Sequence, residues 1–155
     1  MKNVLEVLFP VNVNNTIRGT KIPVYIFALY AILSAVRSCI HLLAPDGGAG
    51  SIAGMDLSVA GAEGIIFAFA LWGSSQLLFA IIQLLVVFRY RALVPFMWLM
   101  LILEVLLRQL VGTMKPVTFA HTPPGAIGNQ LFLPLAALML VLSFWSAYRQ
   151  TSEVQ

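Results

Sequence analysis

The chain has 155 residues, of which nine are Lys or Arg and six are Asp or Glu, so only 10% are charged. Hydrophobic residues make up 60%, and the mean hydropathy is +0.93. A soluble domain carries roughly 25% charged residues, so this composition excludes soluble globular, disordered and coiled-coil proteins. It predicts an all-α, polytopic membrane protein.

The net charge of +3 does not indicate a nucleic-acid partner. Basic residues in a membrane protein mostly mark the loops that stay in the cytoplasm. The single cysteine, Cys39, excludes an internal disulfide and a cysteine-rich zinc site. We expect Cys39 to be a small apolar side chain buried within a helix.

The first apolar stretch, Val4–Phe9, has two open interpretations: a segment that lies along the cytoplasmic interface, or a frayed terminus. Four longer stretches follow, each long enough to cross a hydrocarbon core of about 30 Å. We predict that they are four transmembrane helices in an antiparallel bundle, forming one membrane domain over residues 1–155: residues 22–44, 63–88, 92–113 and 129–148.

The segments between these stretches are short. Residues 45–62 are rich in glycine and carry two Asp, whereas residues 114–128 contain a Pro-Pro-Gly turn signal. The link Arg89-Tyr90-Arg91 is so short that the second and third helices must be antiparallel neighbours.

Lys and Arg residues set the expected orientation. One side of the membrane would carry six of them and the other only Lys115, so the positive-inside rule places both termini in the cytoplasm. The six basic residues are Lys2, Arg18, Lys21, Arg89, Arg91 and Arg149. Short loops without sorting signals are consistent with a bacterial inner membrane.

Five ionisable residues fall inside or at the ends of the predicted spans: Arg37, His41, Glu63, Glu104 and Arg108. With the predicted topology they all lie in the outer half of the bundle. Arg37 and His41 are four residues apart, as are Glu104 and Arg108, so each pair shares a helix face. Two Arg and two Glu sum to zero, and mutual pairing would lower the cost of placing them in a membrane.

Two interpretations of this cluster stay open. It either holds the helices together near the interface, or lines an outward-facing pocket that binds a ligand or relays protons. Glu63 is the candidate protonatable group, although a carboxylate at a helix start is also favoured by the helix dipole. His41, His121 and Glu63 do not show the spacing of a known metal site, so no metal is predicted.

A second set of residues lies on one face of the second predicted helix at heptad-like spacing. Small residues and amides in such a stripe are typical of helix packing in membranes. We therefore assign a packing role to Gly73, Gln76, Ala80 and Gln83, apart from the ionisable cluster.

Gly61-Ala62-Glu63-Gly64 opens the second span, a short basic turn follows, and Glu104 to Gly112 (EVLLRQLVG) closes the third. Over about residues 58–116 this pattern resembles the small four-helix DoxX-like membrane families, which also place a Glu at the start of the second helix and an Arg near the end of the third. Some members look like subunits of quinone-linked oxidoreductases. The resemblance implies the four-helix fold and no catalytic residue, because Asn129 stands where the family often has an acidic residue.

The sequence favours a small integral membrane protein that acts as an accessory subunit or as a lipid- or quinone-binding module. Its candidate ligand-binding residues are Arg37, His41, Glu63, Glu104 and Arg108. We expect membrane lipids as partners, a homo-oligomer or a larger membrane complex as its assembly, and no bound cofactor.

Two alternatives stay open. The first is a membrane enzyme that acts on a lipid-soluble substrate, with Glu63 as acid or base and the two Arg holding an anionic group. The second is a small oligomeric transporter. The scarcity of polar residues on the cytoplasmic side argues against a complete transport pathway.

Overall fold

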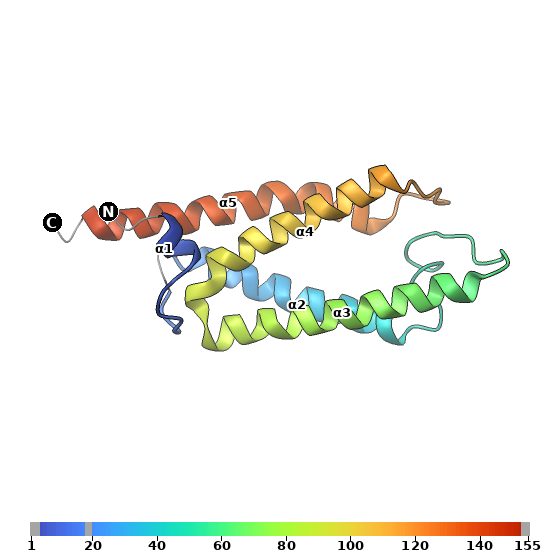
Figure 1. The fold of residues 1–155 in the computed structure, drawn as a ribbon, viewed down its shortest axis with the longest axis horizontal. Helices are drawn as coiled ribbons and strands as arrows, with labels where there is room; N and C mark the ends of the chain where they lie inside the picture. The colour runs from blue at the N-terminus through green and yellow to red at the C-terminus, as the bar shows by residue number, and fades with distance from the viewer. Residues whose placement is uncertain (1–3, 18–19, 153–155) are drawn as a thin grey trace.

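The computed structural model describes residues 4–17 and 20–152, with side chains over 5–17 and 20–145, and over these residues the fold is all-α (Figure 1). The elements are α1 (Val4–Leu8), α2 (Ile22–Leu43), α3 (Ala62–Arg89), a 3-10 turn η1 (Arg91–Leu93), α4 (Val94–Met114) and α5 (Pro124–Ser152). Four of the described helices are long and apolar enough to cross a membrane, which confirms the predicted fold class. Lys2 and Arg18, used above for orientation, lie outside the described residues.

Prolines and a glycine explain several helix boundaries. Pro23 and Pro95 lie in the first turns of α2 and α4. Backbone N–H groups there have no acceptor within the helix, so proline, which lacks an N–H, loses no helical hydrogen bond. Pro45 follows the end of α2 and cannot continue the helix. Gly61 precedes α3 with a φ of 83°, a left-handed conformation that glycine adopts at little cost.

The last helix begins earlier than the sequence predicts. Residues up to Gly128 were expected to form a loop, but α5 starts at Pro124, and the Ala126 N–H donates to the Pro123 carbonyl at 2.9 Å. Proline suits the first position of a helix, so the Pro-Pro-Gly sequence starts a helix here as well as turning the chain. The additional turn places Gly125 and Gly128 beside the pocket described below.

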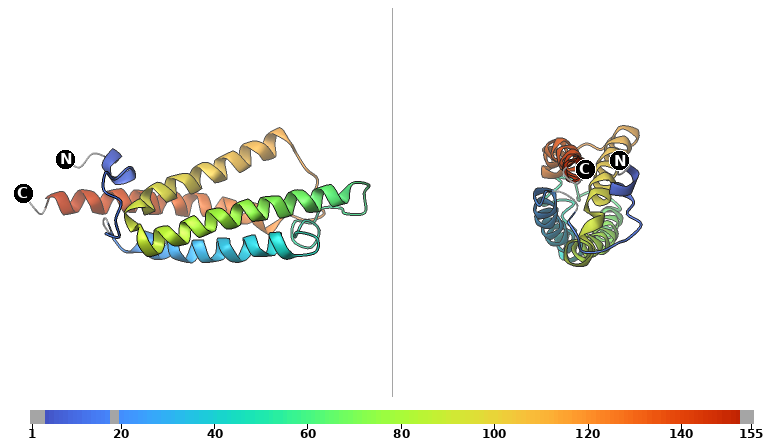
Figure 2. Two further views of the ribbon diagram at one scale, coloured as in Figure 1. Left: turned by 60° about the horizontal axis from the view of Figure 1, so that its bottom comes forward. Right: turned by 90° about the vertical axis from the view of Figure 1, so that its left-hand side faces the viewer.

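The four long helices form two antiparallel pairs, α2 with α3 and α4 with α5 (Figure 1). The first pair is very close at Gly73, where a Cβ would lie 2.8 Å from the His41 Cβ and from the Leu42 nitrogen. Gly73, Ala80 and Gln83 are all buried, which confirms the packing role predicted for these three residues. Figure 2 shows α4 diverging from α3 toward the end that carries the two long loops.

We call the half of the bundle next to loops 44–61 and 115–123 the loop half, and the other the terminal half, because α1 and the end of α5 lie there (Figure 1). The hydrophobic core is in the terminal half. Phe27, Trp98 and Leu101 are fully buried there, and the Trp98 ring N–H donates to the Pro23 carbonyl at 3.2 Å.

The N-terminal segment forms the short helix α1. Val7 is buried, and the Phe9 ring lies 5.6 Å from the Phe96 ring of α4. The segment therefore covers the terminal end of the bundle.

Candidate functional site

A chain of polar contacts crosses the loop half and joins all four long helices. Arg37 of α2 donates to the side-chain oxygen of Gln76 of α3 at 3.0 Å, and the Gln76 amide donates to Glu104 of α4 at 2.8 Å. The same Glu104 oxygen pairs with Arg108 at 2.8 Å, and Arg108 donates to the side-chain oxygen of Asn129 of α5 at 3.3 Å. We call these five residues the polar network.

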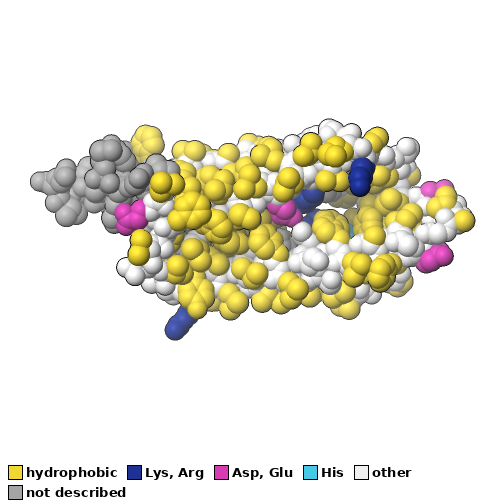
Figure 3. Space-filling model, viewed as in Figure 1, with side chains coloured by type: hydrophobic (Ala, Val, Ile, Leu, Met, Phe, Trp, Pro, Cys, Tyr) yellow, Lys and Arg dark blue, Asp and Glu magenta, His cyan; other side chains and the backbone are white. Residues whose placement is uncertain are grey.

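The polar network occupies a partly sheltered position. The side chains of Arg108 and Glu104 are 25% and 23% exposed. In the space-filling view, charged side chains gather beside a hollow between the two helix pairs (Figure 3). The gap between the pairs is therefore the place where charged groups and free space coincide.

One aromatic side chain, Trp72, packs against Arg37, and a histidine packs against Trp72 in turn. The Arg37 guanidinium carbon lies 5.2 Å from the centre of the Trp72 ring, a distance typical of a cation–π contact. The His41 ring lies 4.9 Å from the same Trp72 ring, and its Nδ1 is 2.8 Å from the Gly47 carbonyl oxygen. Trp72 thus connects Arg37 to a buried histidine.

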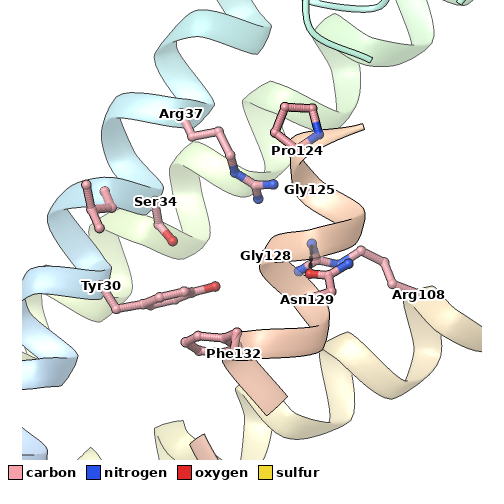
Figure 4. A pocket seen from close by; sticks show the side chains of 10 residues that line it. Tyr30, Ser34, Arg37, Arg108, Pro124, Gly125, Gly128, Asn129 and Phe132 are labelled. Carbon is pink, nitrogen blue, oxygen red and sulfur yellow. Dashed lines mark hydrogen bonds between the residues drawn. The ribbon is translucent and has the colours of Figure 1, made fainter. Parts of the chain in front are cut away.

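A pocket of about 340 Å³ opens beside the polar network, between α2 and the first turns of α5 (Figure 4). This volume is within the range of small-molecule sites, roughly 300–1,000 Å³. Ten described residues line it: Tyr30, Leu33, Ser34, Arg37, Arg108, Pro124, Gly125, Gly128, Asn129 and Phe132.

The lining of the pocket changes character along its length. Arg37, Arg108 and Asn129 are at one end, and Arg37 points from α2 toward α5 (Figure 4). At the other end the Tyr30 and Phe132 rings stack with their centres 4.4 Å apart. Leu33 also lines the pocket, yet it is 58% exposed on the outer surface of the bundle. The pocket therefore has charged and amide groups at one end and mainly aromatic and aliphatic groups at the other, with the hydroxyl groups of Tyr30 and Ser34 on its wall.

The two long loops meet around a second pocket of about 710 Å³, away from the polar network. The Ala120 N–H donates to the Gly54 carbonyl at 2.9 Å, and the His121 ring lies against Gly54. Nearby, Asp46 accepts hydrogen bonds from the backbone N–H groups of Ser51 and Gly48, which lower the pKa of its carboxyl to about 2. These contacts give the loops a defined conformation.

The structure brings together three of the five predicted site residues, Arg37, Glu104 and Arg108. His41 is buried behind Trp72 and does not line the pocket. Glu63 is exposed in the first turn of α3, and 13 residues separate it from Gln76, roughly 20 Å along the helix. The neutral group of two Arg and two Glu that the sequence suggested is therefore not formed.

Three residues that contribute to this site were not among the predicted site residues. Gln76 was assigned to helix packing, but it bridges Arg37 and Glu104; its i, i+4 distance from Trp72 is the signal that the two share a face. Trp72 holds Arg37, and Asn129 holds Arg108. Over the described residues, no three His, Cys, Asp or Glu side chains gather as a metal site would require.

Comparison with protein-family models, with curated proteins and with solved structures finds no match to this chain.

Proposed function

We propose that this protein is a membrane-embedded binding module whose loop-half pocket holds the headgroup of an amphiphile, a lipid or a quinone. The observation that carries the proposal is the pocket with Arg37, Arg108 and Asn129 at one end and Tyr30, Leu33 and Phe132 at the other. A cluster that only fastened helices together would need no space beside it, whereas bound amphiphiles need this combination of polar and apolar walls.

The exposed position of Leu33 supports access from the lipid. A tail that left the pocket between α2 and α5 would pass Leu33 and join the surrounding hydrocarbon. In the other direction, Phe27, Trp98 and Leu101 fill the core of the terminal half. This packing favours a binding site that is closed at its inner end over a transport pathway through one chain.

The enzyme alternative receives less support from the geometry. It relies on Glu63 as acid or base, and Glu63 is exposed at the start of α3 and does not line the pocket. The resemblance to DoxX-like proteins, the bacterial inner membrane and cytoplasmic termini remain part of the proposal. So does assembly as a homo-oligomer or as a subunit of a larger complex.

A pocket-filling substitution tests the proposal. Gly128 lines the pocket, and a Cβ built on it meets no atom within 4 Å, so Gly128→Leu is expected to fold normally while it occupies the headgroup space. Gly112→Leu is the matched control, because Gly112 is also helical and open but lies outside the pocket. The measurement is native mass spectrometry of protein extracted in mild detergent.

We expect the wild type and Gly112→Leu to retain a bound amphiphile and Gly128→Leu to lose it. Equal retention by all three proteins would place the amphiphile elsewhere and contradict the proposal. Extraction of a lone, monodisperse monomer would contradict the assembly part alone.

A further inference from the structure

Arg37 is a membrane-embedded cation whose partners carry no net charge. Its guanidinium donates to the neutral amide of Gln76 and lies over the Trp72 ring. The carboxylate of Glu104 is 2.8 Å from Arg108 and pairs with that residue. Among the described residues Arg37 forms no salt bridge, so two guanidinium groups share one carboxylate, and the site has a net charge of +1.

The pocket wall does not supply the missing charge. None of the ten described residues that line it is Asp or Glu. An unneutralised cation within the membrane is costly, and such groups are generally paired or face a polar cavity. Arg37 points into the pocket, so a ligand in the pocket is well placed to neutralise it (Figure 4).

The opposite wall leaves room for an anion. Pro124, Gly125 and Gly128 form the first turns of α5, and a Cβ on either glycine would meet nothing within 4 Å. The start of this 29-residue helix adds a partial positive charge to that of Arg37 and Arg108. Arginine also suits phosphate and carboxylate groups because its planar donors can bind two oxygens at once.

We infer that the ligand is anionic: an amphiphile whose phosphate or carboxylate headgroup lies between Arg37 and Arg108. This inference rests on the proposed function and narrows it, because a neutral quinone headgroup would leave Arg37 without a counter-charge. The same chemistry would attract free phosphate, so the experiment must separate a lipid headgroup from a small anion.

The test uses the full chain in phosphatidylcholine nanodiscs, with and without phosphatidylglycerol, and reads lipid retention by native mass spectrometry and the thermal unfolding midpoint. Asn129→Asp is the main variant. It retains an oxygen that can accept from Arg108, and it brings the net charge of the site to zero. Arg37→Gln removes the cation itself, and Arg89→Gln is the control, because Arg89 is exposed at the far end of α3.

We expect phosphatidylglycerol to bind in preference to phosphatidylcholine and to raise the midpoint. Asn129→Asp and Arg37→Gln should weaken its retention roughly ten- to hundred-fold, the loss expected for one charged hydrogen bond, and Arg89→Gln should not. A neutral amphiphile held equally well by wild type and Asn129→Asp would overturn the anionic headgroup and leave the proposed function intact. If no protein retains any amphiphile, the anionic headgroup and the proposed function both fail. A midpoint that rises with added inorganic phosphate but not with phosphatidylglycerol would overturn the lipid as the source of the anion.

Discussion

Glu104 is the residue on which the polar network depends, because one of its oxygens accepts from both Gln76 and Arg108. Gln76 connects Glu104 to Arg37 of α2, and Asn129 connects Arg108 to α5, so both links between helices run through neutral amide side chains. Polar contacts between membrane helices contribute modest energies, on average about 0.6 kcal/mol and at most about 1.7. The network is therefore expected to orient the helices more than to stabilise them.

A double-mutant cycle on Glu104 and Arg108 measures this pairing. Each single change to Gln should lower the free energy of unfolding by about 1–2 kcal/mol, because it leaves one partly sheltered charge unpaired. The double variant should lose about 0.5–1.5 kcal/mol less than the sum. Gln109→Ala, an exposed neighbour on α4, is the control for helix propensity. Additive losses in an SDS-unfolding titration would show that the pair is not coupled.

Asp46 gives the loops a pH dependence. Its pKa is lowered from 3.8 to about 2, chiefly by the Ser51 N–H and then by the Gly48 N–H, which donate to the charged form. The contribution to loop stability is therefore complete above the unfolded pKa near 4 and is lost as the pH falls toward 2. The backbone amide shifts of Gly48 and Ser51 should titrate together with a midpoint near 2. A midpoint near 4 would show that these hydrogen bonds do not persist in solution.

At the scale of helices, the contact of α2 with α3 depends on Gly73. A Cβ there would be 2.8 Å from the backbone nitrogen of Leu42, which cannot rotate away, so Gly73→Ala should destabilise the protein by about 1–3 kcal/mol. Gly64→Ala in the same helix meets nothing within 4 Å and should be neutral or stabilising by up to about 1 kcal/mol. The thermal unfolding midpoint should fall for Gly73→Ala and should stay unchanged or rise for Gly64→Ala. An equal fall in both variants would exclude the close approach as the cause.

The four spans could be predicted from hydropathy because each is long, continuous and almost free of charge, so three of them match the observed helices to within about two residues. The start of α5 was missed because Pro-Pro-Gly is a turn signal and a helix-start signal at once. In the same way, Arg37, Glu104 and Arg108 were found because charges within apolar helices are conspicuous. Gln76 was misassigned because helical spacing gives the face of one helix but not the neighbour that this face meets.

At the scale of the whole molecule, the bundle divides into an apolar terminal half and a polar loop half. The closely packed core holds the two helix pairs together at one end, and this leaves the other end free to diverge around the pocket (Figure 2). Because the two halves differ, the polar network and the pocket lie nearer to one side of the membrane than to the other. With the expected orientation, the polar network and the pocket face the outer leaflet.

Thiol labelling tests this orientation. Cys39 is half-buried in α2, so it is first replaced by alanine, and single cysteines are placed at the exposed positions Ser51, Val117 and Tyr90. An impermeant maleimide added to intact cells should label positions 51 and 117, in the two long loops, and should leave position 90 unmodified. The reverse pattern would place the pocket in the cytoplasmic leaflet.

The most direct test of the account is a high-resolution structure of the wild-type protein in native lipid, with the pocket between Arg37 and Asn129 as the place to look. We predict elongated density whose head lies between the Arg37 and Arg108 guanidinium groups and whose tail leaves between α2 and α5 past Leu33. A pocket without such density, with Arg37 paired to Glu104 or turned out of the bundle, would contradict the headgroup site. The polar network would then serve only to hold the helices together.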